Sequence, residues 1–162
     1  APRRPPPHRS RRRSQPAVAR PAPTLAEALK AADADRLDDA IEITDALLAA
    51  DRLHCDAHYV RGVVELARGD AGAAVTALRR ALYLDPRFLA AAFALGRAHE
   101  SLSQHKSARR AYTQALRILD QGHADRPGLV EGLDAGDVEA ACRARLRALA
   151  PGKAIPGPER AT

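Results

Sequence analysis

The chain has 162 residues, of which 46% are hydrophobic but only 3% aromatic, and its formal net charge is +6. This length suits one domain with a modest core, and no apolar run is long enough for a membrane span. No secretory signal appears, and two cysteines are too few for a disulfide scaffold. We therefore expect a cytoplasmic protein.

The first segment, residues 1–23, is a basic tail that holds seven arginines, seven prolines and no acidic residue. Proline fixes φ and like charges repel, so we predict a disordered tail or interdomain linker. A basic arm could instead contact nucleic acid, an anionic membrane surface or an acidic partner. No aromatic residue alternates with the arginines to stack on bases, which favours the linker. The remaining residues, 24–162, carry 19 basic and 20 acidic residues, a net charge of −1.

From Thr24 onward, Ala and Leu recur at helical spacing, and no alternation of period two predicts a strand. Thr24 and Glu27 form a capping box, which predicts a helix start. Turns are expected at residues 33–35 and 68–70. Asp85 and Pro86 should separate two helices, because proline fits a first helical turn but not an interior. The predicted fold class is all-α.

An internal repeat of 34 residues organises these helices. A shift of 34 aligns Ala40, Ala74 and Ala108, among other positions. Twelve residues before each of these alanines stands another small residue, and small contact residues allow two antiparallel helices to approach to about 8–10 Å. Each pair would cover the open face of its neighbour. The pattern predicts three helix pairs, at about residues 21–54, 55–88 and 89–122.

The C-terminal part is predicted to be a loop over 123–134, a helix over 135–150 and a disordered tail over 151–162. The helix carries one apolar stripe, consisting of Val138, Cys142, Leu146 and Leu149. We expect it to cap the third helix pair, with Cys142 as a small buried apolar residue. The alternatives are that it occupies the binding groove or mediates dimerisation.

Catalytic and metal chemistry is weakly represented. His54 and His58 stand four residues apart with Cys55 and Asp56 between them, so a zinc site is conceivable. No further ligand cluster has zinc spacing, and a structural role is favoured. His99 and His105 are expected at the surface or in turns. We predict no catalytic residue, no metal and no cofactor, and therefore no enzyme in this chain.

The repeat resembles the tetratricopeptide repeat, a helix-turn-helix unit of 34 residues that stacks into an α-solenoid. The middle unit matches best, through Gly62, residues 69–70, Ala74, Leu78 and residues 85–86. The resemblance implies a concave groove that binds a protein or peptide. Repeat proteins that bind a C-terminal carboxylate carry lysines and asparagines at the groove positions. This chain has none at those positions, which disfavours binding of a chaperone's C-terminal tail. The implied groove residues are Asp56, Tyr59, Val63, Leu66, Phe93, Arg97 and Glu100.

A narrower resemblance rests on residues 81–88, on the third unit, and on Gly132-Leu133-Asp134-Ala135-Gly136 before the last helix. Their order is similar to the C-terminal repeat region of CheR-class chemotaxis methyltransferases. It implies that the chain is the non-catalytic repeat domain of such an enzyme, which it would recruit or regulate at a chemoreceptor or chemosensory partner. The alternatives are a stand-alone repeat adaptor and a nucleic-acid-associated protein that uses its Arg-rich tail.

Overall fold

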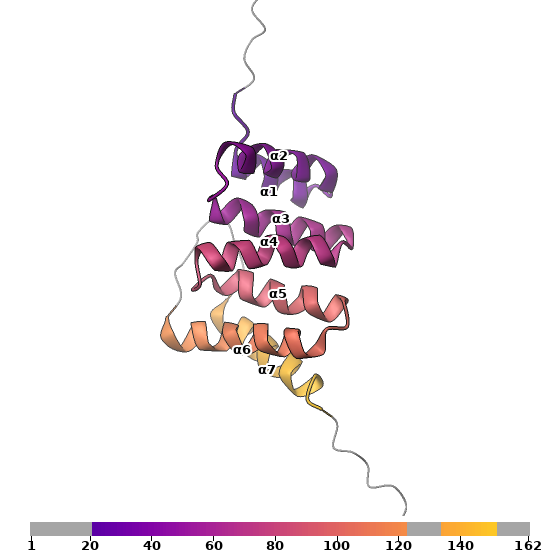
Figure 1. Ribbon diagram of the computed structural model, residues 1–162, viewed down its shortest axis with the longest axis vertical. Coiled ribbons are helices and arrows are strands. Elements are labelled where there is room, and N and C mark those ends of the chain that lie inside the picture. The colour runs from indigo at the N-terminus through magenta and orange to yellow at the C-terminus, as the bar shows by residue number, and fades with distance from the viewer. Residues whose placement is uncertain (1–20, 123–133, 152–162) are drawn as a thin grey trace, which may run out of the picture.

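The computed structural model of the chain describes residues 21–122 and 134–151, and this part of the chain is all-helical (Figure 1). The predicted all-α class is confirmed. Most of each predicted tail (residues 1–20 and 152–162) and of the predicted loop (residues 123–133) lies outside the described residues. The helices are α1 (Leu25–Asp33), α2 (Leu37–Ala50), α3 (Cys55–Arg68), α4 (Ala71–Leu84), α5 (Leu89–Ser101), α6 (His105–Gln121) and α7 (Ala135–Ala148).

Several helices begin where a side chain accepts a hydrogen bond from a free backbone amide. The predicted capping box is present, since Thr24 Oγ1 accepts from the Glu27 amide at 3.3 Å and Glu27 Oε2 accepts from the Thr24 amide at 2.8 Å. Asp70 caps α4 in the same way, accepting from the Ala73 amide at 2.9 Å. These bonds satisfy donors that have no partner inside the helix, and they fix the start of each element.

The 34-residue period extends to the backbone of the turns. Asp35, Gly69 and Ser103 stand 34 residues apart and have φ angles of 57°, 87° and 55°. This left-handed region costs little for glycine but is uncommon for other residues. Only the middle turn has the residue type that this conformation favours, yet all three turns adopt it. The repeat geometry therefore sets the turn even where its usual glycine is absent.

Small residues are buried at the predicted positions of each helix pair, and the two glycines among them make room for large side chains of the partner helix. Ala28, Ala40, Ala74 and Ala108 are fully buried. Gly62 and Gly96 take the matching places in α3 and α5 and are also buried. A Cβ atom on Gly62 would lie 2.5 Å from Cγ of Leu78, and one on Gly96 would overlap the ring of Tyr112. The two glycines therefore serve packing.

The three pairs stack so that alternate helices form two layers (Figure 1). We call α1, α3 and α5 the odd layer and α2, α4 and α6 the even layer. Within the odd layer, α1 contacts α3, and α3 contacts α5. Two apolar clusters result. The larger one spans α4 to α7, and the smaller one joins α1, α2 and α3 around Ala28, Ala31 and Val60, with Tyr59 packing against both clusters.

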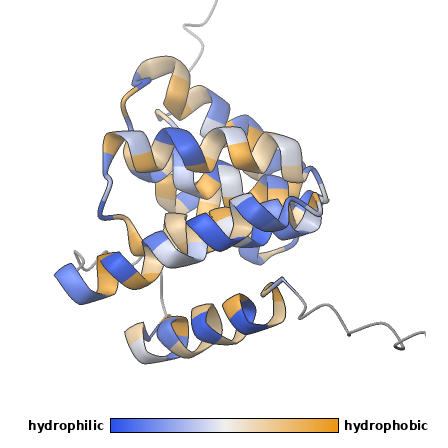
Figure 2. Ribbon diagram, turned by 60° about the horizontal axis from the view of Figure 1, so that its bottom comes forward, coloured by the Kyte–Doolittle hydropathy of each residue, from blue (hydrophilic) through white to orange (hydrophobic). Residues whose placement is uncertain are grey.

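The last helix, α7, follows the third pair and packs against α6, which confirms the predicted capping helix. In Figure 2 this helix carries both hydrophobic and hydrophilic residues, which is typical of a helix that buries one face. Val138 and Cys142 are buried, while Leu146 and Leu149 are half-buried against the larger cluster. None of the helices in the described residues is long and apolar enough to cross a bilayer.

Candidate partner-binding surface

The residues predicted to line a groove occupy one face of α3 and one face of α5. On α3, Asp56, Tyr59, Val63 and Leu66 follow one another at intervals of three or four residues, which keeps them on one side of the helix. On α5, the same spacing relates the other three residues, Phe93, Arg97 and Glu100. We call these seven residues the α3–α5 surface.

Tyr59 and Arg97 connect the two helices of this surface. The Tyr59 ring packs against Phe88, with ring centroids 4.8 Å apart. Burial raises the pKa of the Tyr59 hydroxyl, and the positive charge of Arg97 acts in the opposite direction. The guanidinium of α5 is therefore close enough to act on a side chain of α3. Arg97 itself is exposed and makes no ion pair with any residue that the structure describes.

A hydrogen-bonded group closes the C-terminal end of the α3–α5 surface. The Tyr112 hydroxyl donates to Glu100 at 2.6 Å, and Arg145 of α7 lies 3.7 Å from the same carboxylate. Burial, followed by the bond to Glu100, raises the pKa of Tyr112 well above its ordinary range. The ring of Phe93 lies 5.9 Å from that of Tyr112. Helix α7 therefore contributes a charge at the edge of the surface.

The seven residues divide between surface and core. Val63 is 38% exposed and Arg97 is also exposed, whereas Tyr59, Leu66 and Phe93 are half-buried and pack against the larger cluster. Asp56 and Glu100 are half-buried too. The result is an apolar floor with an exposed valine and an exposed cation above it. Their role in binding remains a prediction.

The histidines serve local structure. His54 Nδ1 accepts from the Ala57 amide at 3.2 Å at the start of α3, and His58 Nε2 lies 2.9 Å from the carbonyl oxygen of Arg52. Among the described residues, no three His, Cys, Asp or Glu side chains are grouped so that they could hold a metal ion. The prediction for His99 was wrong. It is only 5% exposed and pairs with Gln104 at 2.7 Å, because the turn between α5 and α6 folds back over it.

Cys142 provides a test of how α7 is buried. Its side chain is fully buried, and burial raises the pKa of the thiol from an ordinary 9.0 to about 11. Above pH 9 the unfolded chain releases this proton while the folded chain retains it, so stability is lost as the pH rises toward 11. Between about pH 8 and pH 10.5, this thiol alone should remove roughly 2 kcal/mol from the free energy of unfolding.

The measurement is urea unfolding at both pH values, for the natural chain and for Cys142→Ala. Tyr59 and Tyr112 also have raised pKa values and titrate in both proteins, so the difference between the two proteins isolates the thiol. Equal pH dependence in the two proteins would show that Cys142 is accessible to solvent.

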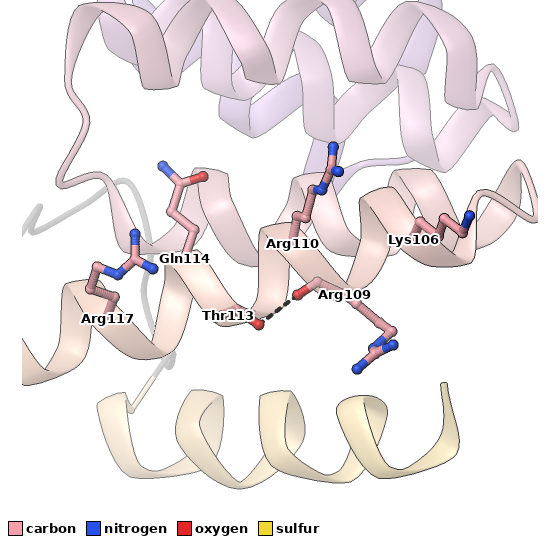
Figure 3. Close-up of a pocket in the computed structure, with 6 residues that line it drawn as sticks. All are labelled: Lys106, Arg109, Arg110, Thr113, Gln114 and Arg117. Carbon is pink, nitrogen blue, oxygen red and sulfur yellow. Dashed lines mark hydrogen bonds between the residues drawn. The ribbon is translucent and has the colours of Figure 1, made fainter. Parts of the chain in front are cut away.

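The sequence analysis missed a second charged surface, on the even layer. Figure 3 shows a shallow hollow along α6 that is lined by Lys106, Arg109, Arg110, Thr113, Gln114 and Arg117. Apart from Asp120 near its end, α6 contains no acidic residue, and α4 contains none. A charge count for each helix would have found this surface, whereas the sum over residues 24–162 concealed it.

Comparison with known proteins supports the repeat fold. The tetratricopeptide repeat family matches residues 56–88 and 89–118, so the chain contains at least two such repeats. The first helix pair, α1 and α2, lies outside that match. No curated protein has a sequence that matches the chain.

Solved structures of similar fold include PcrH in complex with the chaperone binding region of PopD, with a TM-score of 0.66 at 18% identity over 76% of this chain and 86% of that one. The Yersinia enterocolitica type III secretion chaperone SycD, in complex with a peptide of the translocator YopD, has a TM-score of 0.65 at 14% identity over 76% and 87%. The Sgt2 TPR domain from Aspergillus fumigatus has a TM-score of 0.62 at 20% identity over 79% of both chains. At these identities the likeness is one of fold.

Proposed function

We propose that this chain is a protein–protein interaction module that binds a peptide or an amphipathic helix along the α3–α5 surface. The observation that carries the proposal is the position of exposed Val63 and Arg97 beside the half-buried rings of Tyr59 and Phe93. An apolar floor beside a free cation suits a ligand with apolar anchors and a carboxylate. Two chaperones of similar fold, PcrH and SycD, are seen in complex with segments of other proteins.

The charge of the surface indicates what the ligand should contain. Arg97 makes no ion pair with a described residue, whereas Glu100 already accepts from Tyr112 and lies near Arg145. A carboxylate on the ligand can therefore pair with Arg97 without competition from Glu100. In a helical ligand, apolar side chains three or four residues from that carboxylate would then reach Val63 and Tyr59.

The test is selection of peptides from a random library on the full chain, followed by affinity measurement against variants. Tyr59 and Phe93 are unsuitable as probes because both pack against the core. In contrast, Val63→Glu combined with Arg97→Glu changes exposed atoms. We expect the selected peptides to be acidic and apolar and to bind this double variant at least tenfold more weakly.

Leu102→Glu is the matched control, because Leu102 is 39% exposed against 38% for Val63 and lies in the turn after α5. Peptide affinity should be unchanged in this control. Unchanged affinity in the double variant, with circular dichroism showing that it is folded, would place peptide binding elsewhere on the solenoid.

We further propose that the module belongs to a chemosensory methyltransferase of the CheR class, which it would recruit to or regulate at its receptor. The support is the order of sequence segments from residue 81 to 136 that resembles that family's repeat region. The gene should then encode an S-adenosylmethionine-dependent methyltransferase domain ahead of residue 1. Its absence there would favour the stand-alone adaptor.

A further inference from the structure

The charges of the solenoid are segregated along its length. Residues 24–54, the first helix pair, contain eight acidic and three basic residues, a net charge of −5. Residues 71–122, from α4 to α6, contain three acidic and eight basic residues, a net charge of +5. The near-neutral sum over residues 24–162 therefore hides two regions of opposite charge. Within the solenoid, an anionic partner is attracted by α4 to α6 and repelled by the first helix pair.

The positive half has a defined face on the even layer. Six exposed cations and one aromatic residue form it, and we call them the cationic face: Arg79, Arg80, Tyr83, Lys106, Arg109, Arg110 and Arg117. A hollow lined by Arg79, Tyr83 and Arg110 joins α4 to α6, so the two helices present one continuous surface.

These six cations make no ion pair with any residue in the described part of the chain. The acidic residues of the first pair differ in this respect, because Asp38 lies 3.1 Å from Arg68 and Asp45 pairs with Arg61. Exposed cations that make no ion pair raise the local positive potential. In Figure 3, the Arg110, Gln114 and Arg117 side chains extend from α6, as does Arg109 on the side of α7.

The residue types indicate which anion fits the cationic face. Five of the six cations are arginines, whose planar guanidinium binds phosphate with two hydrogen bonds. Tyr83 is 78% exposed, and the guanidinium of Arg80 lies 6.0 Å from its ring centroid. An exposed aromatic ring among arginines suits an unpaired base that stacks between phosphate contacts, whereas an acidic peptide would gain little from the ring.

We infer that the cationic face binds single-stranded nucleic acid, with arginines on the phosphates and Tyr83 stacked on a base. The strand would lie across α4 and α6 and avoid the acidic first pair. Because this face belongs to the even layer and the α3–α5 surface to the odd layer, a peptide and a nucleic acid could be bound together. The inference is independent of the peptide proposal, since neither surface shares a residue with the other.

The test is fluorescence anisotropy of a labelled oligothymidine of about 20 nucleotides, titrated with the full chain over a series of salt concentrations. The variant replaces Arg109, Arg110 and Arg117 with Gln. Its matched control replaces Lys30, Arg36 and Arg52 with Gln, which removes the same charge from the first pair. Circular dichroism and thermal unfolding verify that both remain folded.

We expect the α6 variant to bind at least tenfold more weakly and to lower the slope of log affinity against log salt by about 2, at roughly 0.7 per phosphate contact. The control should retain most of the affinity. Tyr83→Ala should weaken binding about fivefold or more without changing the salt slope, since stacking releases no counterions.

Two results would overturn the inference. An equal loss of affinity for oligothymidine in the α6 variant and in its control would show that the strand responds only to the net charge of the chain or is bound by the Arg-rich residues 1–20. Tighter binding of a polyglutamate peptide than of oligothymidine, lost in the same α6 variant, would identify the partner as an acidic protein.

Discussion

Gly96→Ala is expected to lower the free energy of unfolding by about 2 kcal/mol, although alanine is the better helix former. The added Cβ would overlap Cε1 of Tyr112 and lie 2.7 Å from Cδ1 and Cζ of the same ring. The ring cannot move aside easily, because it is fully buried and its hydroxyl is held by Glu100. Helix α5 must therefore separate from α6. Urea unfolding followed by circular dichroism measures the loss.

Gly72→Ala is the matched control for this prediction. Gly72 is exposed in the first turn of α4, and the nearest atom to an added Cβ is Oδ1 of Asp70 at 3.6 Å. Without a clash, the substitution should stabilise the chain by about 0.5–1 kcal/mol through lower backbone entropy in the unfolded state. If both alanine variants were stabilised equally, α5 and α6 would not approach as closely as the structure has them.

Leu78→Ala should cost about 3 kcal/mol of free energy of unfolding, because this side chain is fully buried in the larger cluster. Gly62→Ala should also destabilise, since the new Cβ would lie 2.5 Å from Cγ and 2.8 Å from Cδ2 of Leu78. In the double variant the alanine at 62 enters the space that leucine vacated. The double variant should therefore be more stable than the sum of the single losses predicts.

The coupling free energy from this double-mutant cycle should be about 1–2 kcal/mol. Gly72→Ala in the Leu78→Ala background is the control, because Gly72 has no contact with Leu78 among its nearest atoms and the two changes should add. Additive losses for the pair at 62 and 78 would mean that α3 and α4 do not meet at these residues.

The fold was predictable from the sequence because the residues that repeat every 34 positions stand at the contacts between paired helices. Small residues spaced by 34 mark the contact between paired helices, and the structure places Gly62 against Leu78 and Gly96 against Tyr112. The capping box at Thr24 was also readable, since it depends on two residues of one short segment. Such signals are local or strictly periodic, and a single sequence displays both.

The candidate surface was less predictable, since repeat positions indicate a face but not its neighbours. The same register that placed Tyr59 on the groove face could not show that Phe88 lies 4.8 Å from its ring. Likewise, His99 is buried by the turn that follows it, a contact that depends on how the chain reverses. Whether a side chain such as tyrosine or histidine is buried depends on the residues that pack beside it in the fold, and repeat spacing does not show those residues.

The uneven division of the core has a consequence for how the molecule opens. The cluster around α1 and α2 consists of three alanines and two valines from α3, whereas the larger cluster contains buried Leu, Phe, Tyr and Ile side chains. In a linear array, the stability of each unit is the sum of its own contacts and those with its neighbours. The first helix pair, which has the smaller cluster, is therefore less stable than the rest. Amide hydrogens of the first helix pair should therefore exchange through a partial opening that leaves α4 to α7 folded. The N-terminal end of the solenoid should therefore unfold locally while the remaining helices stay folded.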